Sequence, residues 1–293
     1  MTLPQRVLPG TTYLVTRRCL DRRFYLVPSE ETNAILLYAL AYNAAKHGVE
    51  VHAFGYQSNH EHVELTDVRG VRPDFIRDLH RDIAMAMKEL HGIPETMWSD
   101  AVTSSVELVN EAAQVDAALY ILLNPVTAGL VARAQDWPGA VSLPGASVVN
   151  ARRPKTYFSE RRPEHVELRI TPPPAWSGTA QQWHEHITEQ VAEGERTVAA
   201  RRRCEGLAVL GATIVKHQRP FDRPRNRDRL EAKRNPVLAA GGDAVALKAA
   251  IAGLRAWRTT YREQRPRWTS DKRVAFPPGT WWVVQRAGAV AAA

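Results

Sequence analysis

The residues whose types and spacing could do chemistry are a pair of histidines and, further along, a tyrosine with an asparagine. His60 and His62 lie in a run with the alternation of a strand, and residues two apart in a strand project from the same face. The two imidazoles could therefore hold one divalent metal ion. Tyr120 and Asn124 are four residues apart in a helical pattern, which places them on one helix face. A metal pair with a placed tyrosine indicates phosphodiester chemistry.

Two imidazoles leave a divalent ion under-coordinated, so we expect a third protein ligand and open positions for a phosphate oxygen. Asn124 could supply an amide oxygen, and Glu64, in phase with both histidines, is a weaker candidate. Imidazole ligands alone favour zinc, whereas phosphodiester enzymes with an open site commonly use Mg²⁺ or Mn²⁺. We expect a divalent cofactor, Mg²⁺ or Mn²⁺. A phosphotyrosine would conserve the energy of the broken bond for resealing, which suits strand transfer.

A second His-x-His pair, His184 and His186, serves as an internal comparison. Its surroundings have helical periodicity, so side chains two apart point about 200° away from each other. We do not expect this pair to hold a metal ion.

The elements that must position these residues alternate between strands and helices in the first half. Ser29 is a helix N-cap, Gly48 is a helix stop, and Asn110 is a further N-cap. Strands are predicted over residues 11–18, 51–57, 60–66 and 102–109, and helices over 29–48, 73–91 and 110–125, the last one stopped by Pro125. This order predicts an α+β fold, a ferredoxin-like antiparallel sheet covered by helices, with one helix added.

Charge divides the chain. The net charge is +8, but residues 1–150 carry 12 Lys and Arg against 17 Asp and Glu, while residues 151–293 carry 27 against 14. The basic half suits a polyanion, and the charge alone favours nucleic acid modestly over the alternative of a solvated, arginine-rich surface. We divide the chain into a domain over 1–145, a Pro/Arg-rich linker over 146–178 and a basic, mainly helical extension over 179–293. Helices are predicted over 179–203 and 244–264, and residues 219–234 form an Arg/Pro-dense loop.

Composition also bears on location. No apolar run approaches the ~18 residues needed to cross a bilayer, and the N-terminus lacks the apolar core of a secretory signal. The two cysteines, Cys19 and Cys204, are expected to be free thiols. We expect a cytoplasmic, nucleoid-associated protein with no membrane partner, as a monomer or homodimer.

Three strings make the sequence resemble a known family, the HUH single-tyrosine transposases, and within it the REP-associated, domesticated branch. They are Val51-His-Ala-Phe-Gly-Tyr-Gln-Ser-Asn-His-Glu-His-Val-Glu-Leu65, Tyr120-Ile-Leu-Leu-Asn-Pro-Val-Thr-Ala-Gly-Leu-Val131 and Asp136-Trp-Pro-Gly139. The resemblance covers about residues 10–145. Phe276-Pro-Pro-Gly-Thr-Trp-Trp282 is similar to an ending of longer members.

The resemblance implies single-stranded DNA cleavage and joining, as in DNA transposition and recombination, with hairpin-forming DNA as the partner. It implies that His60 and His62 hold the metal, that Asn124 is a further ligand, and that Tyr120 forms a 5′-phosphotyrosine while freeing a 3′-hydroxyl. Arginines are the candidate contacts to DNA phosphates: Arg17, Arg18, Arg152, Arg153, Arg201, Arg202 and Arg203.

The sequence departs from the family pattern at two places. Glu61 occupies a middle position that is normally hydrophobic, and burying that carboxylate unpaired would be costly. Either the strand is locally more exposed, or Glu61 has a partner such as an arginine. Gln57-Ser58 also stands where Met-Pro or Met-Ser is usual. The alternatives are therefore a degraded HUH protein that only binds DNA, and an RNA-directed protein of the same fold.

Overall fold

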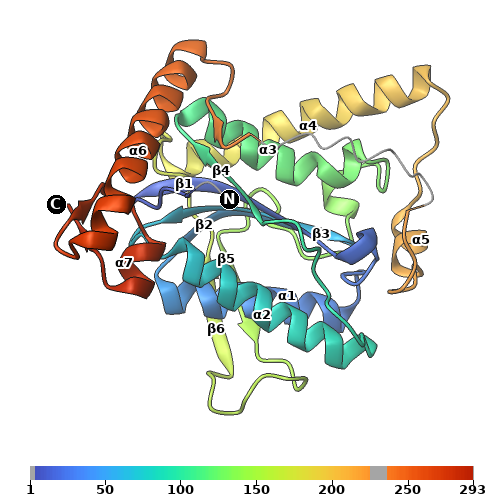
Figure 1. Ribbon diagram of the computed structural model, residues 1–293. Coiled ribbons are helices and arrows are strands. Elements are labelled where there is room, and N and C mark those ends of the chain that lie inside the picture. Colours follow the sequence, from blue (N-terminus) through green and yellow to red (C-terminus); the bar gives the residue numbers. More distant parts are fainter. Residues whose placement is uncertain (1–3, 225–235, 293) are drawn as a thin grey trace.

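The computed structural model describes residues 4–224 and 236–292, and its centre is a five-stranded sheet with strand order β2-β3-β1-β4-β7 (Figure 1). The strands are β1 (Thr11–Arg18), β2 (Glu50–Gln57), β3 (His60–Asp67), β4 (Ser104–Leu108) and β7 (Leu238–Ala239). Neighbours are antiparallel except for β4 and β7, which are parallel. The first four strands have the order of a ferredoxin-like sheet, so the predicted α+β fold is confirmed.

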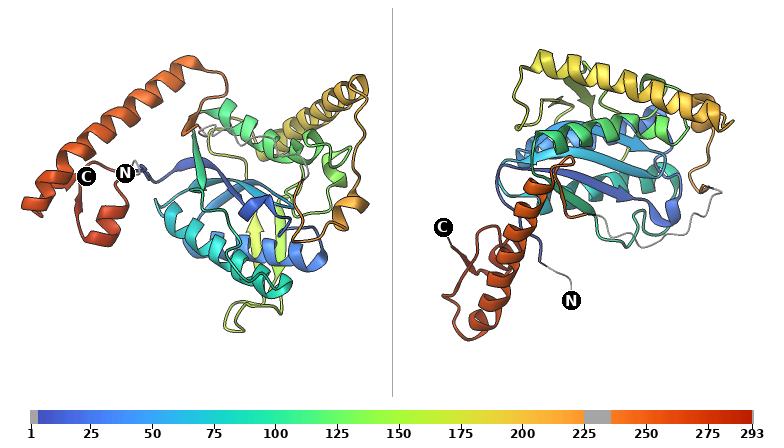
Figure 2. Two further views of the ribbon diagram at one scale, coloured as in Figure 1. Left: turned by 45° about the vertical axis from the view of Figure 1, so that its right-hand side comes forward. Right: turned by 90° about the horizontal axis from the view of Figure 1, so that it is seen from above.

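Helices cover both faces of this sheet (Figures 1 and 2). One face carries α1 (Glu30–His47) and α2 (Arg72–His91), and the other carries α3 (Glu111–Thr127), on which α4 (Ala180–Cys204) packs. The shorter and C-terminal helices are η1 (Leu20–Arg22), η2 (Ala134–Asp136), α5 (Ala212–Lys216), α6 (Ala244–Ser270) and α7 (Trp282–Ala287). The sheet is thus a middle layer, and any residue on it faces one of two helical layers.

Local signals explain where the helices begin and end. The Ser29 hydroxyl accepts a hydrogen bond from the Thr32 amide at the start of α1, and Gly48 ends it with φ +66°. Asn110 caps α3 in the same way. Helix α3 passes Pro125 and ends two residues later, so the prediction that Pro125 stops it is slightly short. Proline removes only its own amide bond there, and the Ala128 amide still donates to Asn124.

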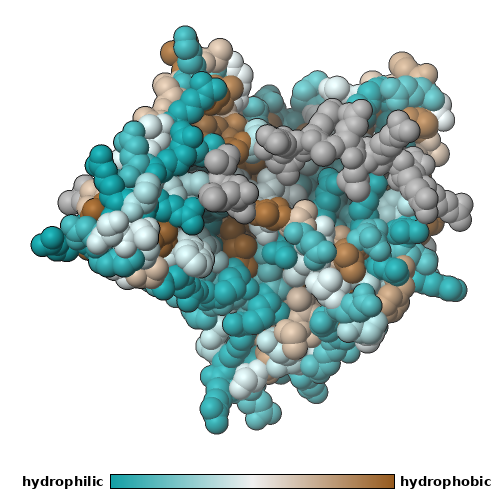
Figure 3. Space-filling model, viewed as in Figure 1, coloured by the Kyte–Doolittle hydropathy of each residue, from teal (hydrophilic) through white to brown (hydrophobic). Residues whose placement is uncertain are grey.

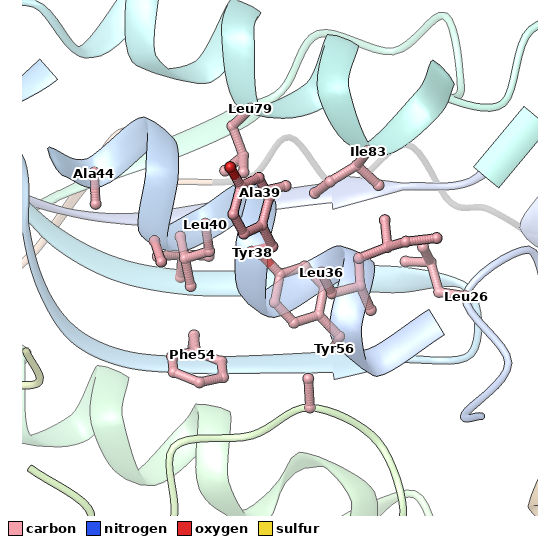
Figure 4. Packing of buried hydrophobic residues seen from close by; sticks show 14 of the residues in the cluster. Leu26, Leu36, Tyr38, Ala39, Leu40, Ala44, Phe54, Tyr56, Leu79 and Ile83 are labelled. Carbon is pink, nitrogen blue, oxygen red and sulfur yellow. The ribbon is translucent and has the colours of Figure 1, made fainter. Parts of the chain in front are cut away.

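Two apolar clusters hold these layers together. Between the sheet and the first pair of helices, side chains of α1, α2 and β2 meet, including Leu40, Phe54 and Leu79 (Figure 4). On the other face, Ile121 and Leu122 of α3 pack with Trp183 and Ile187 of α4. The outer surface seen in Figure 3 is mostly hydrophilic, with smaller apolar areas between. Among the described residues, none of the helices combines the length and the apolar composition of a membrane span.

The segment over 146–178, expected to be a linker, contains a β-hairpin instead. Strands β5 (Val148–Arg152) and β6 (His165–Arg169) pair antiparallel, and one of their faces packs on α1. Ala151, Phe158 and Leu168 are buried in the α1 cluster. The prolines of this segment, with Arg153, Arg161 and Arg162, lie outside the two short strands, which is why the sequence has the pattern of an extended arm.

The C-terminal residues form a smaller unit around α6, which extends from one side of the molecule (Figure 2). Trp257 and Tyr261 of α6 cluster with Phe276 of β8 (Ala275–Phe276), a short strand that pairs in parallel with β9 (Val290–Ala291). Helix α6 is longer than the predicted 244–264, and α4 matches its prediction closely. Most of the predicted 219–234 loop lies outside the described residues.

Candidate active site

His60 and His62 lie side by side on the sheet face that α3 covers. They are the first and third residues of β3, and their ring centroids are 4.8 Å apart. The β-strand alternation that predicted this arrangement is therefore present, and it directs Glu61 to the opposite face. In contrast, His184 and His186 lie in helix α4, where His186 packs beside Trp176.

Each imidazole is oriented by a neighbouring polar group. The Nδ1–H of His60 donates to Asn59 Oδ1 over 2.6 Å, which leaves its Nε2 with a lone pair. A 2.8 Å hydrogen bond joins Nδ1 of His62 to the hydroxyl of Thr16, its cross-strand neighbour on β1. Such outer contacts fix the ring orientation of metal-binding histidines.

Helix α3 brings Tyr120 and Asn124 to the same place. The Tyr120 ring stands edge-on to the His62 ring with centroids 4.9 Å apart, and 51% of Tyr120 is exposed. The Asn124 amide nitrogen lies 3.4 Å from Nε2 of His62, and the Asn124 side chain also hydrogen-bonds His60. The structure thus assembles all four sequence-predicted site residues within one chain.

Both histidines are held in their neutral form. Burial lowers the pKa of His60 to about 4, helped by the charges of Arg18 and Arg22. Burial, the neighbouring His60 and the charge of Arg18 lower the pKa of His62 well below its usual range. Neutral imidazole is the form that ligates a metal ion.

The donors fit a divalent ion as a mixed set of two ring nitrogens and one amide oxygen. In residues 4–224 and 236–292, no group of three His, Cys, Asp or Glu side chains is arranged to hold a metal. Glu64, the weaker ligand candidate, is on the same face but is fully buried, and neither carboxyl oxygen forms a hydrogen bond to a described residue. Burial raises the pKa of Glu64 well above its usual range, which favours the protonated carboxyl over the carboxylate that a metal ion would bind. His60, His62 and Asn124 are the residues that would hold the ion.

Strand alternation separates the two arginines at the end of β1. Arg18 pairs in register with His60 and lies on the site face, where its charge acts on both imidazoles. Arg17 lies on the opposite face, where its guanidinium donates to Thr103 and lies over the ring of Trp98. Only Arg18 of the two is beside the site.

The remaining predicted DNA contacts fall in two separate regions. Arg201, Arg202 and Arg203 end α4, and Arg202 packs against Gly129 at the end of α3, close to Asn124. The hairpin arginines are on the α1 side of the sheet. Arg152 pairs with Glu164 at 3.0 Å, and Arg153 donates to carbonyl oxygens of its own loop.

Glu61, the departure from the family pattern, is fully buried and pairs with a histidine. Its carboxylate is hydrogen-bonded to Nε2 of His80 on α2, and Nδ1 of His80 lies 3.2 Å from Arg17. The strand is not locally exposed, and the partner is His80 rather than an arginine. This pair supports the site from behind, through the strand that holds His60 and His62.

A cleft of about 1350 Å³ opens beside His60 and Asn124. One wall is the β2–β3 turn with Gln57, and the other is residues 205–224, which we call the covering segment. The amides of Leu210 and Gly211 donate to the carbonyls of Gly129 and Leu130, each over 2.9 Å. These bonds tie the covering segment to the end of α3.

The other end of the covering segment is fastened near the start of the chain. The Phe24 amide donates to the Asp222 carbonyl over 2.9 Å, and Ser58 Oγ donates to Gln218 Oε1 over 2.8 Å. The covering segment therefore crosses the cleft from α3 to the loop after β1.

Sequence reasoning missed three contributors to this site. Thr16 orients His62, Asn59 orients His60, and Gln57 lines the cleft opposite the covering segment. Asn59 stands directly before the histidine motif, which was a usable signal. The role of Thr16 depends on strand register, which the sequence does not display.

Comparisons with known proteins come from solved structures. No protein-family model matches the chain, and no curated protein sequence matches it. It is similar to the structure of a REP-associated tyrosine transposase bound to a REP hairpin, with 19% identity, 47% of this chain and 81% of that chain covered, and a TM-score of 0.41. It is also similar to a candidate transposase from Deinococcus radiodurans R1, with 20% identity, 41% and 95% coverage, and a TM-score of 0.30.

Proposed function

We propose that this protein is a metal-dependent nuclease that cleaves and joins single-stranded DNA through Tyr120. The observation that carries the proposal is the convergence of His60, His62, Asn124 and a half-exposed Tyr120 in one chain. Hairpin-forming DNA is the proposed substrate, on the strength of the sequence resemblance to HUH transposases.

The chemical step would be attack of the Tyr120 phenol oxygen on a backbone phosphorus. The new bond joins Tyr120 Oη to phosphorus, and the bond from phosphorus to the 3′-oxygen breaks. The phenol proton is lost, and the departing 3′-oxygen takes up a proton. A Mg²⁺ or Mn²⁺ ion held by His60, His62 and Asn124 would polarise the scissile phosphate.

The protein's own residues provide metal-binding nitrogens and positive charge at the site of this step. Neutral imidazoles leave their ring nitrogens available, and the nearby positive charge of Arg18 suits an anionic strand. Arg201 to Arg203, at the end of α4 near Gly129, extend the positive charge beyond the cleft. A strand lying along this side would pass Tyr120 with its backbone toward His60 and His62.

The test is to trap the covalent adduct. The protein is incubated with single-stranded DNA hairpins and Mn²⁺ or Mg²⁺, denatured in SDS, and the modified peptide is mapped by mass spectrometry. We expect an adduct on Tyr120 that Tyr120→Phe abolishes and that Tyr157→Phe, on the far side of the sheet, leaves unchanged. Tight DNA binding with no adduct on any hairpin would instead favour a protein that binds DNA without cutting it.

A further inference from the structure

Gln57 is a buried residue that lines the cleft, and its side-chain amide has no hydrogen-bond partner among the described residues. It is the last residue of β2, only 2% exposed, and it lines the cleft. Neither its amide oxygen nor its amide nitrogen forms a hydrogen bond with any described residue. A buried side chain that could both donate and accept is costly to leave unsatisfied, so a ligand in the cleft is the expected partner.

Register places Gln57 directly beside the proposed catalytic centre. Gln57 pairs across the turn with His60, and paired residues of antiparallel strands project from the same face. The amide is thus on the same side of the sheet as the imidazoles, and His60 and Asn124 line the same cleft. A group bound there could belong to the same DNA strand as a phosphate at the histidines, a few covalent bonds away from it.

The rest of the cleft combines apolar side chains with three arginines and one acid, Asp222. Leu130, Ile214 and Phe221 line it, and so do Arg22 and Arg223. An unpaired nucleobase has apolar faces and a polar edge, and its neighbouring phosphates are anionic. The cleft volume of about 1350 Å³ is ample for one nucleotide with its flanking phosphates.

From these observations we infer that the cleft receives an unpaired base next to the scissile phosphate, and that Gln57 reads the edge of this base. The inference rests on the proposed DNA-cleaving function and adds a specificity residue to it. A glutamine amide offers one acceptor and one donor side by side, which matches adenine. Adenine is therefore the base that we expect at this position.

The experiment is a binding selection with the full chain carrying Tyr120→Phe, so that binding is measured without cleavage. The probe is a DNA hairpin flanked by randomised unpaired nucleotides. We expect adenine to be enriched at one unpaired position by roughly 5- to 150-fold, the discrimination of one bidentate amide contact. Adding Gln57→Ala should abolish the preference at that position alone.

Two further variants separate recognition from folding. Gln57→Glu keeps the size of the side chain but offers only acceptors, so the preferred base should change from adenine to cytosine. Gln181→Ala, on the exposed surface of α4, should leave the whole profile unchanged. Thermal melting of each variant checks that the fold is retained.

The outcomes distinguish this inference from the proposed cleavage. An unchanged base profile in Gln57→Ala and Gln57→Glu, or no enriched base in the parent, would overturn base reading. So would a loss of Mn²⁺ affinity in Gln57→Ala with the profile intact, since Gln57 would then be a metal ligand. If base reading fails but an adduct on Tyr120 forms, the cleavage proposal stands and the base-reading inference falls. If base reading is found and no adduct forms, the base-reading inference stands and the cleavage proposal falls.

Discussion

The ring of Tyr120 meets the ring of His62 edge-on, with the centroids 4.9 Å apart and the ring planes inclined by 77°. The first ring comes from α3 and the second from β3, so the packing of α3 on the sheet sets this contact. Because both residues belong to one chain, a single copy brings the proposed nucleophile to the proposed metal site. Metal affinity at this site and the stability that nearby buried residues contribute can be measured separately.

Asn124 should contribute to metal affinity. Replacing it with alanine removes the amide that lies against His60 and His62, and we expect Mn²⁺ binding to weaken by roughly 10-fold or more. Asn124→Asp should bind Mn²⁺ more tightly than Asn124→Ala because it supplies a charged oxygen. Isothermal titration with Mn²⁺ measures both, with Asn150→Ala as the surface control. Equal affinities in all four proteins would exclude Asn124 as a ligand.

The buried pair of Glu61 and His80 should matter as a pair. His80→Leu leaves the Glu61 carboxylate buried without its partner and should lower the free energy of unfolding by roughly 3 kcal/mol or more. The double variant Glu61→Val with His80→Leu should recover much of that loss, because no buried charge remains. Urea unfolding of the two single variants and the double variant completes the cycle. Additive losses would show that the two side chains are not coupled.

His52 should make stability fall in mild acid. Its Nδ1–H donates to the Thr171 carbonyl, its Nε2 accepts from Thr66, and burial lowers its pKa from 6.5 to about 4. The unfolded chain therefore binds a proton that the folded chain does not. The stabilisation is full above pH 6.5 and is lost as the pH falls to about 4, by about 3 kcal/mol.

The measurement compares urea unfolding between pH 7 and pH 4. His52→Gln should be less stable at pH 7 yet show a shallower decline with acid than the parent. His165→Gln, on the exposed face of β6, is the matched control and should follow the parent. A decline as steep in His52→Gln as in the parent would assign the acid sensitivity to other groups.

Glu64 should destabilise the protein at neutral and alkaline pH. Burial raises the pKa of its carboxyl well above its usual range, so the folded chain holds a proton that the unfolded chain releases. Its favourable contribution is present below the unfolded pKa of 4.5 and is lost as the pH rises. Glu64→Leu should therefore be more stable than the parent at pH 8, by about 1–3 kcal/mol, with a smaller difference near pH 5.

Thermal and urea unfolding at the two pH values test this difference, with the exposed Glu50→Leu as control. Mn²⁺ affinity should be unchanged in Glu64→Leu. A loss of Mn²⁺ affinity would instead make Glu64 a metal ligand that swings toward the histidines.

The parts of the site that the sequence predicts are those set by local periodicity. His60 and His62 follow from strand alternation, and Tyr120 and Asn124 follow from the helical repeat, because each pair lies within one element. The βαββαβ order follows from the same short-range patterns, together with the caps at Ser29 and Asn110.

What the sequence could not predict depends on which elements meet. His80 is 19 residues from Glu61, and only the packing of α2 on the sheet makes them partners. The hairpin of β5 and β6 was hidden because its buried face is defined by α1, a distant segment. The covering segment has short-range sequence features of a surface loop, and its place over the cleft comes from bonds to Gly129 and Phe24.

The strands β2 and β4 flank the central pair β3 and β1, and other parts of the same chain already bond backbone groups on the outer side of both. On the β2 side, Phe54 and Tyr56 exchange main-chain hydrogen bonds with Ser142 and Ala140, and on the β4 side β7 does the same at Glu107. A partner molecule could add a strand at these backbone groups only by first displacing these segments. Copies that met through helical or loop surfaces would leave His60, His62, Tyr120 and Asn124 together within each copy.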